Sequence, residues 1–169
     1  MPKGLKPTSG VIVISSGITE SAADTFTDQK VDMQLNVLDR EVFVVTAVDI
    51  DVRPPANRTD TKTQASMSVS TTERTSVGGL DQSNVLAAAN ITIENVGDTC
   101  VAVNSYSSTE SPHAQLEYIG IIATNDFYLN LEGSNNGFAL AGNARLWGYR
   151  AQADAATFAA LTQSELLSA

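Results

Sequence analysis

Residues 127–150 read FYLNLEGSNNGFALAGNARLWGYR, and this stretch decides the fold class. Phe127, Leu129 and Leu131 alternate with polar residues, which is the period-two pattern of a strand with one buried face. The next five residues, GSNNG, predict a tight connection, because Asn and Gly tolerate positive φ angles. The chain then returns as a second alternating strand. The stretch therefore predicts a β-hairpin.

Other alternating or apolar runs, bounded by turn residues, predict further strands before this hairpin. They lie at residues 31–37, 42–52, 67–71, 91–95, 100–106 and 115–124. The last of these is apolar on both faces, which suits the middle of a sheet. The segment 81–89 instead predicts a short helical turn, because it has capping residues and several alanines.

Alternation also predicts which residues of the strand 42–52 share one face. The expected set is Val42, Val44, Thr46, Val48, Ile50 and Val52. Pro54 and Pro55 end this strand, since neither can donate to a ladder.

The chain is expected to divide into three parts. Residues 1–28 are rich in Pro, Gly and small polar residues and predict a flexible N-terminal arm, in which Val11–Ile14 can pair with a sheet edge, including one in a neighbouring subunit. Residues 29–153 predict one antiparallel β-sandwich, with a jelly roll as the preferred topology. Residues 154–169 predict a helix capped by Asp154 and packed on the sandwich or on a neighbouring copy.

Composition excludes several classes of protein. The formal net charge of −9 disfavours strong nucleic-acid binding through a broad basic surface. The single cysteine, Cys100, and the single histidine, His113, cannot form an intramolecular disulfide or a zinc site built from several such ligands. No apolar run is long enough for a secretion signal or a membrane span, so no membrane partner is expected.

The sequence contains no recognisable catalytic or cofactor motif. Asp49 and Asp51 lie on one face of a strand, where paired carboxylates can hold calcium or share a proton. Without a surrounding loop of further oxygen ligands, a solvated strand end is the better interpretation. We therefore expect no catalytic residue, no metal and no cofactor, and we expect a protein that is not an enzyme.

Arg145, Trp147 and Tyr149 form the strongest surface candidate. They alternate along the last strand, and these three residue types are enriched where proteins contact partners or stack on ligand rings. We therefore predict an interface or ligand face there. The alternative is that the C-terminal helix covers Trp147 and Tyr149, and for Trp147 we favour this buried position.

The segment LEYIGIIATNDFYLNLEGSNNG and the ending ARLWGYRAQADAATFAALTQSELLSA resemble the small single-jelly-roll structural proteins of virus particles, across residues 28–169. The resemblance implies a virion location and a capsid or coat subunit that self-assembles into a symmetric shell. Its partners would be other copies of itself and other virion proteins. Such coat proteins often carry a strongly basic arm, whereas this arm offers only Lys3 and Lys6, which argues against genome packaging.

Two other classes of function stay open. A receptor- or glycan-binding β-sandwich, such as a phage tail-fibre tip, would use the face formed by Arg145, Trp147 and Tyr149. A β-sandwich enzyme would need further acidic or metal partners around Asp49 and Asp51.

Overall fold

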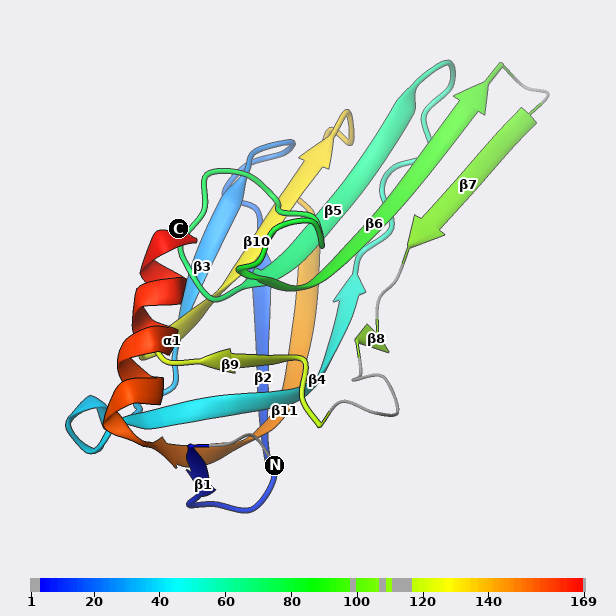
Figure 1. Ribbon diagram of the computed structural model, residues 1–169. Coiled ribbons are helices and arrows are strands. Elements are labelled where there is room, and N and C mark those ends of the chain that lie inside the picture. Colours follow the sequence, from blue (N-terminus) through cyan, green and yellow to red (C-terminus); the bar gives the residue numbers. More distant parts are fainter. Residues whose placement is uncertain (1–3, 98–99, 107–108, 111–116, 169) are drawn as a thin grey trace.

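The computed structural model describes residues 4–97, 100–106, 109–110 and 117–168, in which two antiparallel β-sheets form a sandwich (Figure 1). Sheet A contains β1 (Leu5–Pro7), β2 (Ile12–Thr19), β4 (Glu41–Val52), β8 (Thr109–Glu110), β9 (Gly120–Ile122) and β11 (Ala141–Ala153). Sheet B contains β3 (Thr27–Asp32), β5 (Lys62–Ser70), β6 (Val85–Val96), β7 (Cys100–Tyr106) and β10 (Asp126–Ser134). A short 3-10 helix spans Val37–Asp39, and the helix α1 spans Ala155–Leu167.

The strand pairs are nested as in one long hairpin. β2 pairs with β11, β3 with β10, β4 with β8 and β9, and β5 with β6, all antiparallel. Successive pairs alternate between sheet A and sheet B. A long hairpin rolled up in this way is a jelly roll, and the antiparallel β-sandwich expected from the sequence is confirmed.

The predicted hairpin at residues 127–150 is wrong, although both of its strands exist. β10 lies in sheet B between β3 and β5, whereas β11 lies in sheet A between β2 and β4. The connection between them therefore crosses from one sheet to the other. Both edges of each strand are already occupied by other partners, so β10 and β11 have no edge left to pair with each other.

Two acidic residues from the β2–β3 connection hold this crossing in place. Glu20 is buried, and its carboxylate accepts hydrogen bonds from the backbone N–H groups of Gly133 and Leu140. Asp24 accepts a hydrogen bond of 2.8 Å from the backbone N–H of Asn136. These contacts give buried backbone donors the partners that a ladder would otherwise supply.

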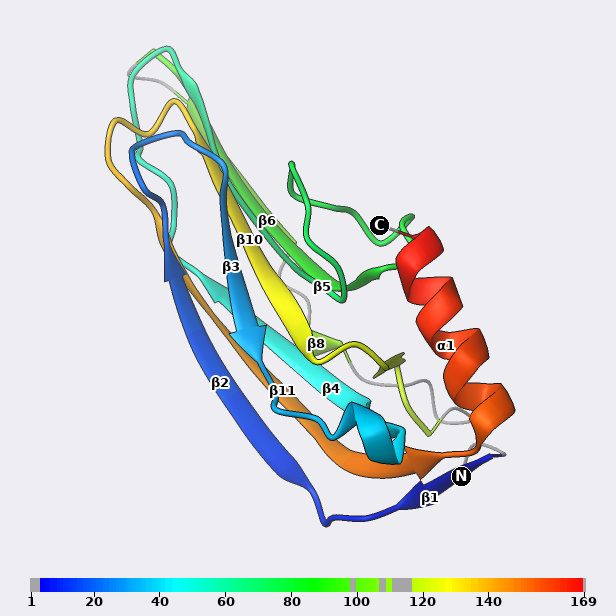
Figure 2. The ribbon, with the colours of Figure 1, turned by 90° about the vertical axis from the view of Figure 1, so that its left-hand side faces the viewer.

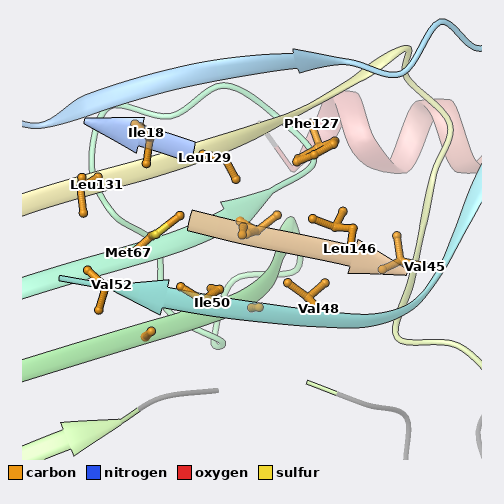
Figure 3. Packing of buried hydrophobic residues seen from close by; sticks show 14 of the residues in the cluster. Ile18, Val45, Val48, Ile50, Val52, Met67, Phe127, Leu129, Leu131 and Leu146 are labelled. Atoms are coloured by element: carbon orange, nitrogen blue, oxygen red, sulfur yellow. The ribbon is translucent and has the colours of Figure 1, made fainter. Parts of the chain in front are cut away.

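The main hydrophobic core lies between the two sheets (Figure 3). Figure 3 shows Val48, Ile50 and Val52 of β4 in this cluster with Leu146 of β11. Facing residues from sheet B fill the other half of it. Those from β5 and β10 are Ala65, Met67, Val69, Phe127, Leu129 and Leu131.

A β-bulge changes the expected face of β4. Trp147 pairs with Ala47 and Gly148 with Val45, so Thr46 is an extra residue on β4. An extra residue shifts the period-two pattern by one position. As a result Val42 and Val44 do not share the inner face with Val48, and they pack in a second cluster on the outer face of sheet A.

Residues 4–28 belong to the sandwich, which corrects the expectation that they form an arm outside it. β1 pairs with β11, with Pro7 opposite Ala151. β2 also pairs with β11, from Ile12 to Thr19. Leu5 and Ile18 are buried in the two clusters. The expected edge pairing of Val11–Ile14 therefore occurs within the chain, from Ile12 onward.

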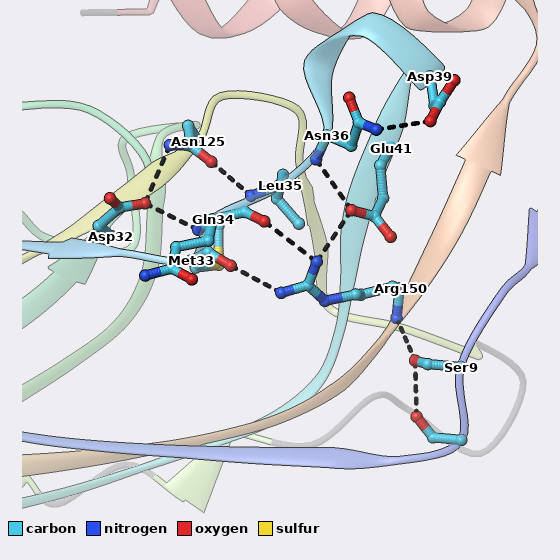
Figure 4. Close-up of polar contacts among 11 residues, drawn as sticks. Ser9, Asp32, Met33, Gln34, Leu35, Asn36, Asp39, Glu41, Asn125 and Arg150 are labelled. Carbon is cyan, nitrogen blue, oxygen red and sulfur yellow. Dashed lines mark hydrogen bonds and ion pairs between the residues drawn. The ribbon is translucent and has the colours of Figure 1, made fainter.

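The strand predicted at 31–37 ends earlier than the alternating sequence pattern indicated. β3 ends at Asp32, and the next buried residues, Met33 and Leu35, lie in an irregular segment that polar contacts hold (Figure 4). The guanidinium of Arg150 donates to the carbonyl oxygen of Met33 over 2.8 Å and to the carboxylate of Glu41 over 2.9 Å. The alternation of buried and exposed residues thus continues beyond the ladder, although the chain is not extended there, because Gln34 has a φ of 52°.

Two further expectations need correction. The segment 81–89 is not a helical turn, because β6 begins at Val85 and pairs with β5 through its alanines. The apolar segment near residue 120 forms β9, which pairs with β4 at an edge of sheet A rather than in the middle of a sheet. The start of that predicted strand, residues 115–116, lies outside the described residues.

The C-terminal helix forms as predicted and packs on its own chain. Asp154 is its N-cap, and its side chain accepts a hydrogen bond of 2.7 Å from the backbone N–H of Thr157, which lowers the pKa of Asp154. Phe158 and Leu161 pack on the outer cluster of sheet A, and the helix stands beside β9 (Figure 2). No helix in the described part of the chain is long and apolar enough to cross a membrane.

Candidate functional site

The three residues predicted as an interface or ligand face share the outer face of β11 but lie in different surroundings. The guanidinium carbon of Arg145 is 5.8 Å from the centre of the Trp147 ring, and Arg145 Nε donates to Ser15 Oγ over 3.3 Å. Tyr149 packs against the outer cluster of sheet A. Alternation thus predicted their common face but not their separate neighbours.

Trp147 is half-buried, and it belongs to neither hydrophobic cluster. Its neighbours across the sheet are Val13 of β2 and Ala47 of β4. The expectation that α1 covers Trp147 is therefore not met, because the helix packs on the part of β11 that follows it. Whether the side chain contacts a partner stays a prediction.

A polar depression of about 530 Å³ adjoins Arg145 on the outer face of sheet A. Asp49 and Asp51 line it, as does Asn143, so the two carboxylates share one face as expected. Asp49 lies opposite Arg145 in the ladder. The described residues contain no group of three or more His, Cys, Asp or Glu side chains that could hold a metal ion.

From the sequence, Cys100 is interpreted as a small buried hydrophobic residue rather than as the partner of His113 in a catalytic dyad. His113 lies outside the described residues, and Cys100 is the first residue of β7.

Exposed apolar side chains gather at two open sheet edges. On β7, Val101 is 51% exposed and Val103 is 60% exposed, and this strand pairs with β6 alone in the described part of the chain. On the other sheet, Val11 just before β2 is 71% exposed and Val13 of β2 is 52% exposed, and among the described residues β2 pairs with β11 alone. The sequence predicted a strand at 100–106, but nothing in its pattern showed that this strand would be an edge.

The two edges lie on opposite sides of the sandwich. β2 lies over β3, and β4 lies over β6, so β2 and β7 flank the molecule. In Figure 1, β7 forms the right-hand edge, away from α1. An unpaired strand edge with apolar side chains is a template for pairing with another strand.

Sequence reasoning missed two buried acidic residues, Glu20, which holds the crossing between the sheets, and Glu165. Glu165 of α1 is buried, and its carboxylate accepts hydrogen bonds from the backbone N–H groups of Ala123 at 3.1 Å and Thr124 at 2.8 Å. Burial raises the pKa of Glu165 to about 7, and the two backbone donors only partly oppose this. This residue joins the helix to the end of β9, and no pattern in the sequence marked it.

Comparison with known proteins places the chain near several viral and phage structures at low similarity. No protein-family model and no curated protein matches the sequence. A structure titled Desmodium yellow mottle tymovirus has 12% identity and a TM-score of 0.34, with 92% of this chain and 98% of that chain covered. At this low TM-score the likeness assigns no function to the chain.

Two tailspike structures are less similar. The tailspike protein gp49 of Acinetobacter baumannii bacteriophage Fri1, a capsular polysaccharide depolymerase, has 9% identity and a TM-score of 0.16, covering 80% of this chain and 20% of that one. The tailspike protein of Acinetobacter baumannii phage AM24 has 13% identity and a TM-score of 0.14, covering 79% and 26%. Neither likeness carries information about the function of this chain.

Proposed function

We propose that the chain is a virion structural protein, a capsid or coat subunit whose copies associate into a symmetric shell. The observation that carries this proposal is the pair of open apolar edges, β7 on sheet B and β2 on sheet A. The jelly-roll topology and the resemblance of the sequence to small virion proteins support it. The subunit has no catalytic role in this proposal, and neither a membrane nor a strongly bound nucleic acid is among its partners.

The positions of the edges favour a head-to-tail contact between copies. Because β2 and β7 differ and flank the molecule, the edge of one copy meets the opposite edge of the next. Contacts of this kind are heterologous and close into rings when the rotation between copies allows it. Backbone pairing would hold the two strands together, and Val13 and Val103 would lose their exposed surface.

The mass of the purified protein tests the proposal. We expect light scattering and sedimentation to give a species much larger than one chain, with closed particles in negative-stain images. Val101→Lys combined with Val103→Lys places charges at the edge of β7 and should shift the protein toward monomers. Leu38→Lys is the matched control, because Leu38 is 95% exposed and lies on neither edge.

Two results would contradict the proposal. A wild-type protein that stays monomeric at every concentration and salt would exclude the assembly function. A double variant that assembles as the wild type does, with its fold intact by circular dichroism, would exclude β7 as the contact.

A further inference from the structure

A groove crosses the outer face of sheet B, on the opposite sheet from the face predicted from the sequence. A hollow of about 720 Å³ lies over β5, β6 and β7, and a second of about 400 Å³ adjoins it over β10. The two share Gln64, Ser66 and Glu132 as lining residues, so they form one continuous groove. A hollow of this size is within the usual range for ligand sites.

Strand register builds the floor of the groove from two rows of side chains. In the first row Tyr106, Asn90, Ser66 and Glu132 are successive cross-strand neighbours. With strands about 4.8 Å apart, the row runs about 14 Å from β7 to β10. This length accommodates more than one sugar ring.

The second row repeats the same chemistry one step along the strands. Asn104, Thr92, Gln64 and Ser134 are successive neighbours and also line the groove. Apart from Glu132, both rows are therefore made of amides, hydroxyls and one aromatic ring. No lysine or arginine is among the residues that line the groove.

Hydrogen bonds between the rows hold the floor side chains in place. Ser66 Oγ accepts from Gln64 Nε2 at 2.8 Å and from Asn90 Nδ2 at 2.9 Å. Thr92 Oγ1 donates to Asn90 Oδ1 over 3.1 Å. Each amide carries two N–H donors and a carbonyl oxygen with two lone pairs, more than these bonds use. The groove therefore offers both hydrogen-bond donors and hydrogen-bond acceptors to a ligand. Side chains already held in position lose less freedom when a ligand binds.

The connection between β5 and β6 forms one wall of the groove. Its Val77 and Leu80 line the hollow, and Leu80 is 60% exposed. The backbone N–H of Gly78 donates to Ser68 Oγ over 3.1 Å, which fixes this wall to the sheet. Ser70 Oγ adds a bond of 2.8 Å to the carbonyl oxygen of Thr72 within the same segment.

Tyr106 supplies a stacking surface at one end. It is 78% exposed, although large aromatic side chains usually bury most of their area. A pyranose ring has an apolar face of C–H groups that packs on an aromatic ring, while its hydroxyls both donate and accept hydrogen bonds. Amide and hydroxyl side chains match such groups, and a carboxylate such as that of Glu132 accepts from them more strongly.

We propose that this groove binds a neutral oligosaccharide. Glu132 and Asp24 line it, so their charge and the net charge of −9 disfavour nucleic acids and anionic glycans. An extended peptide pairs with a strand edge through its backbone, whereas this groove presents side chains of a sheet face. The binding activity goes beyond the proposed assembly function and does not depend on it.

Titration with neutral hexasaccharides tests the proposal. The probes are cellohexaose, chitohexaose, maltohexaose and mannohexaose, with a heparin hexasaccharide as the anionic comparison, followed by calorimetry and saturation-transfer NMR. We expect at least one neutral probe to bind with a Kd below about 1 mM and the anionic probe not to bind. A disaccharide of the same sugar should bind more weakly, because it reaches fewer of the row's side chains.

Variants locate the site. Tyr106→Ala and Glu132→Ala should each weaken binding by about tenfold or more, and both positions are exposed, so the fold should persist. Trp147→Ala on the other sheet is the matched control and should leave the affinity unchanged. Glu132 lies on β10, away from the β7 edge. If Glu132→Ala loses oligosaccharide binding while the mass of the assembled protein is unchanged, the binding site is separate from the assembly contact.

The outcomes decide between this site and the alternatives. Absence of binding by every neutral probe overturns the proposal, as does tighter binding of the heparin probe. Binding that Trp147→Ala abolishes and Tyr106→Ala leaves intact would assign the ligand to the outer face of sheet A instead.

Discussion

Trp147 lies between Val13 of β2 and Ala47 of β4, on the outer face of sheet A, and Arg145 stacks near its ring. A half-buried ring outside both clusters contributes less to folding than a core aromatic. We therefore expect Trp147→Ala to lower the free energy of unfolding by about 1–2 kcal/mol. Phe127→Ala, which empties a fully buried site, should cost about 3–5 kcal/mol.

Urea denaturation of both variants beside the wild type measures this difference. Equal losses for Trp147→Ala and Phe127→Ala would mean that Trp147 is a core residue after all. An unchanged unfolding midpoint combined with lost assembly would instead assign Trp147 to a contact between copies.

Glu165 makes the docking of α1 depend on pH. Its pKa rises from 4.5 in an unfolded chain to about 7 in the fold, so the folded state holds the proton more tightly. The contribution of this group to stability is therefore fully present below about pH 4.5 and is lost as the pH rises to about 7. The nearby carboxylate of Asp126 adds to the rise in the pKa.

Glu165→Gln removes this titration while it keeps an oxygen acceptor for Ala123 and Thr124. We expect the variant to gain stability over the wild type between pH 4.5 and pH 7, by about 3 kcal/mol at most. Thermal unfolding followed across that range measures the difference. Parallel stability profiles for the two proteins would show that Glu165 does not titrate there.

At the scale of elements, the crossing from β10 to β11 depends on an acidic residue far away in the sequence. Glu20 follows β2 and accepts from two buried backbone N–H groups, those of Gly133 and Leu140. Glu20→Ala leaves both donors without a partner, and each unpaired buried donor costs about 1–3 kcal/mol. We expect a total loss of about 2–6 kcal/mol.

Glu20→Gln is the matched control, since its amide oxygen can still accept from at least one of the two donors. Its loss of stability should be smaller than that of Glu20→Ala in the same chemical denaturation series. If both variants unfold at the wild-type midpoint, the crossing does not depend on this carboxylate.

At the scale of the whole molecule, charge opposes the association that the open edges favour. Every copy carries a formal net charge of −9, so neighbouring copies repel one another. Salt screens this repulsion, and at about 0.01 M the Debye length is roughly 30 Å, compared with about 8 Å at 0.15 M. We therefore expect assembly to strengthen as sodium chloride is raised over this range.

Sedimentation velocity at fixed protein concentration checks this expectation. The large species should grow at the expense of the monomer as the salt concentration rises. A fall in assembly with salt would mean that attractive charge pairs, rather than the apolar edges of β2 and β7, hold the copies together.

The sequence alone predicted the fold class, most strand positions and the capped C-terminal helix. These features are local: the period-two pattern in 127–131 follows from the alternation of side chains along a strand, and Asp154 caps a helix that begins immediately after it. The common face of Arg145, Trp147 and Tyr149 was predictable for the same reason. None of these conclusions requires knowledge of a partner strand.

Only the tertiary structure decided which strands pair, which faces are covered and where the groove lies. The sequence predicted β10 and β11 as one hairpin, but each strand pairs with other strands that are distant in the sequence. The extra residue Thr46 moved both Val42 and Val44 to the outer face of sheet A. The row from Tyr106 to Glu132 exists only because four strands align in register. Pairing depends on which apolar faces meet across the whole sandwich, and such non-local contacts leave no pattern within any single segment.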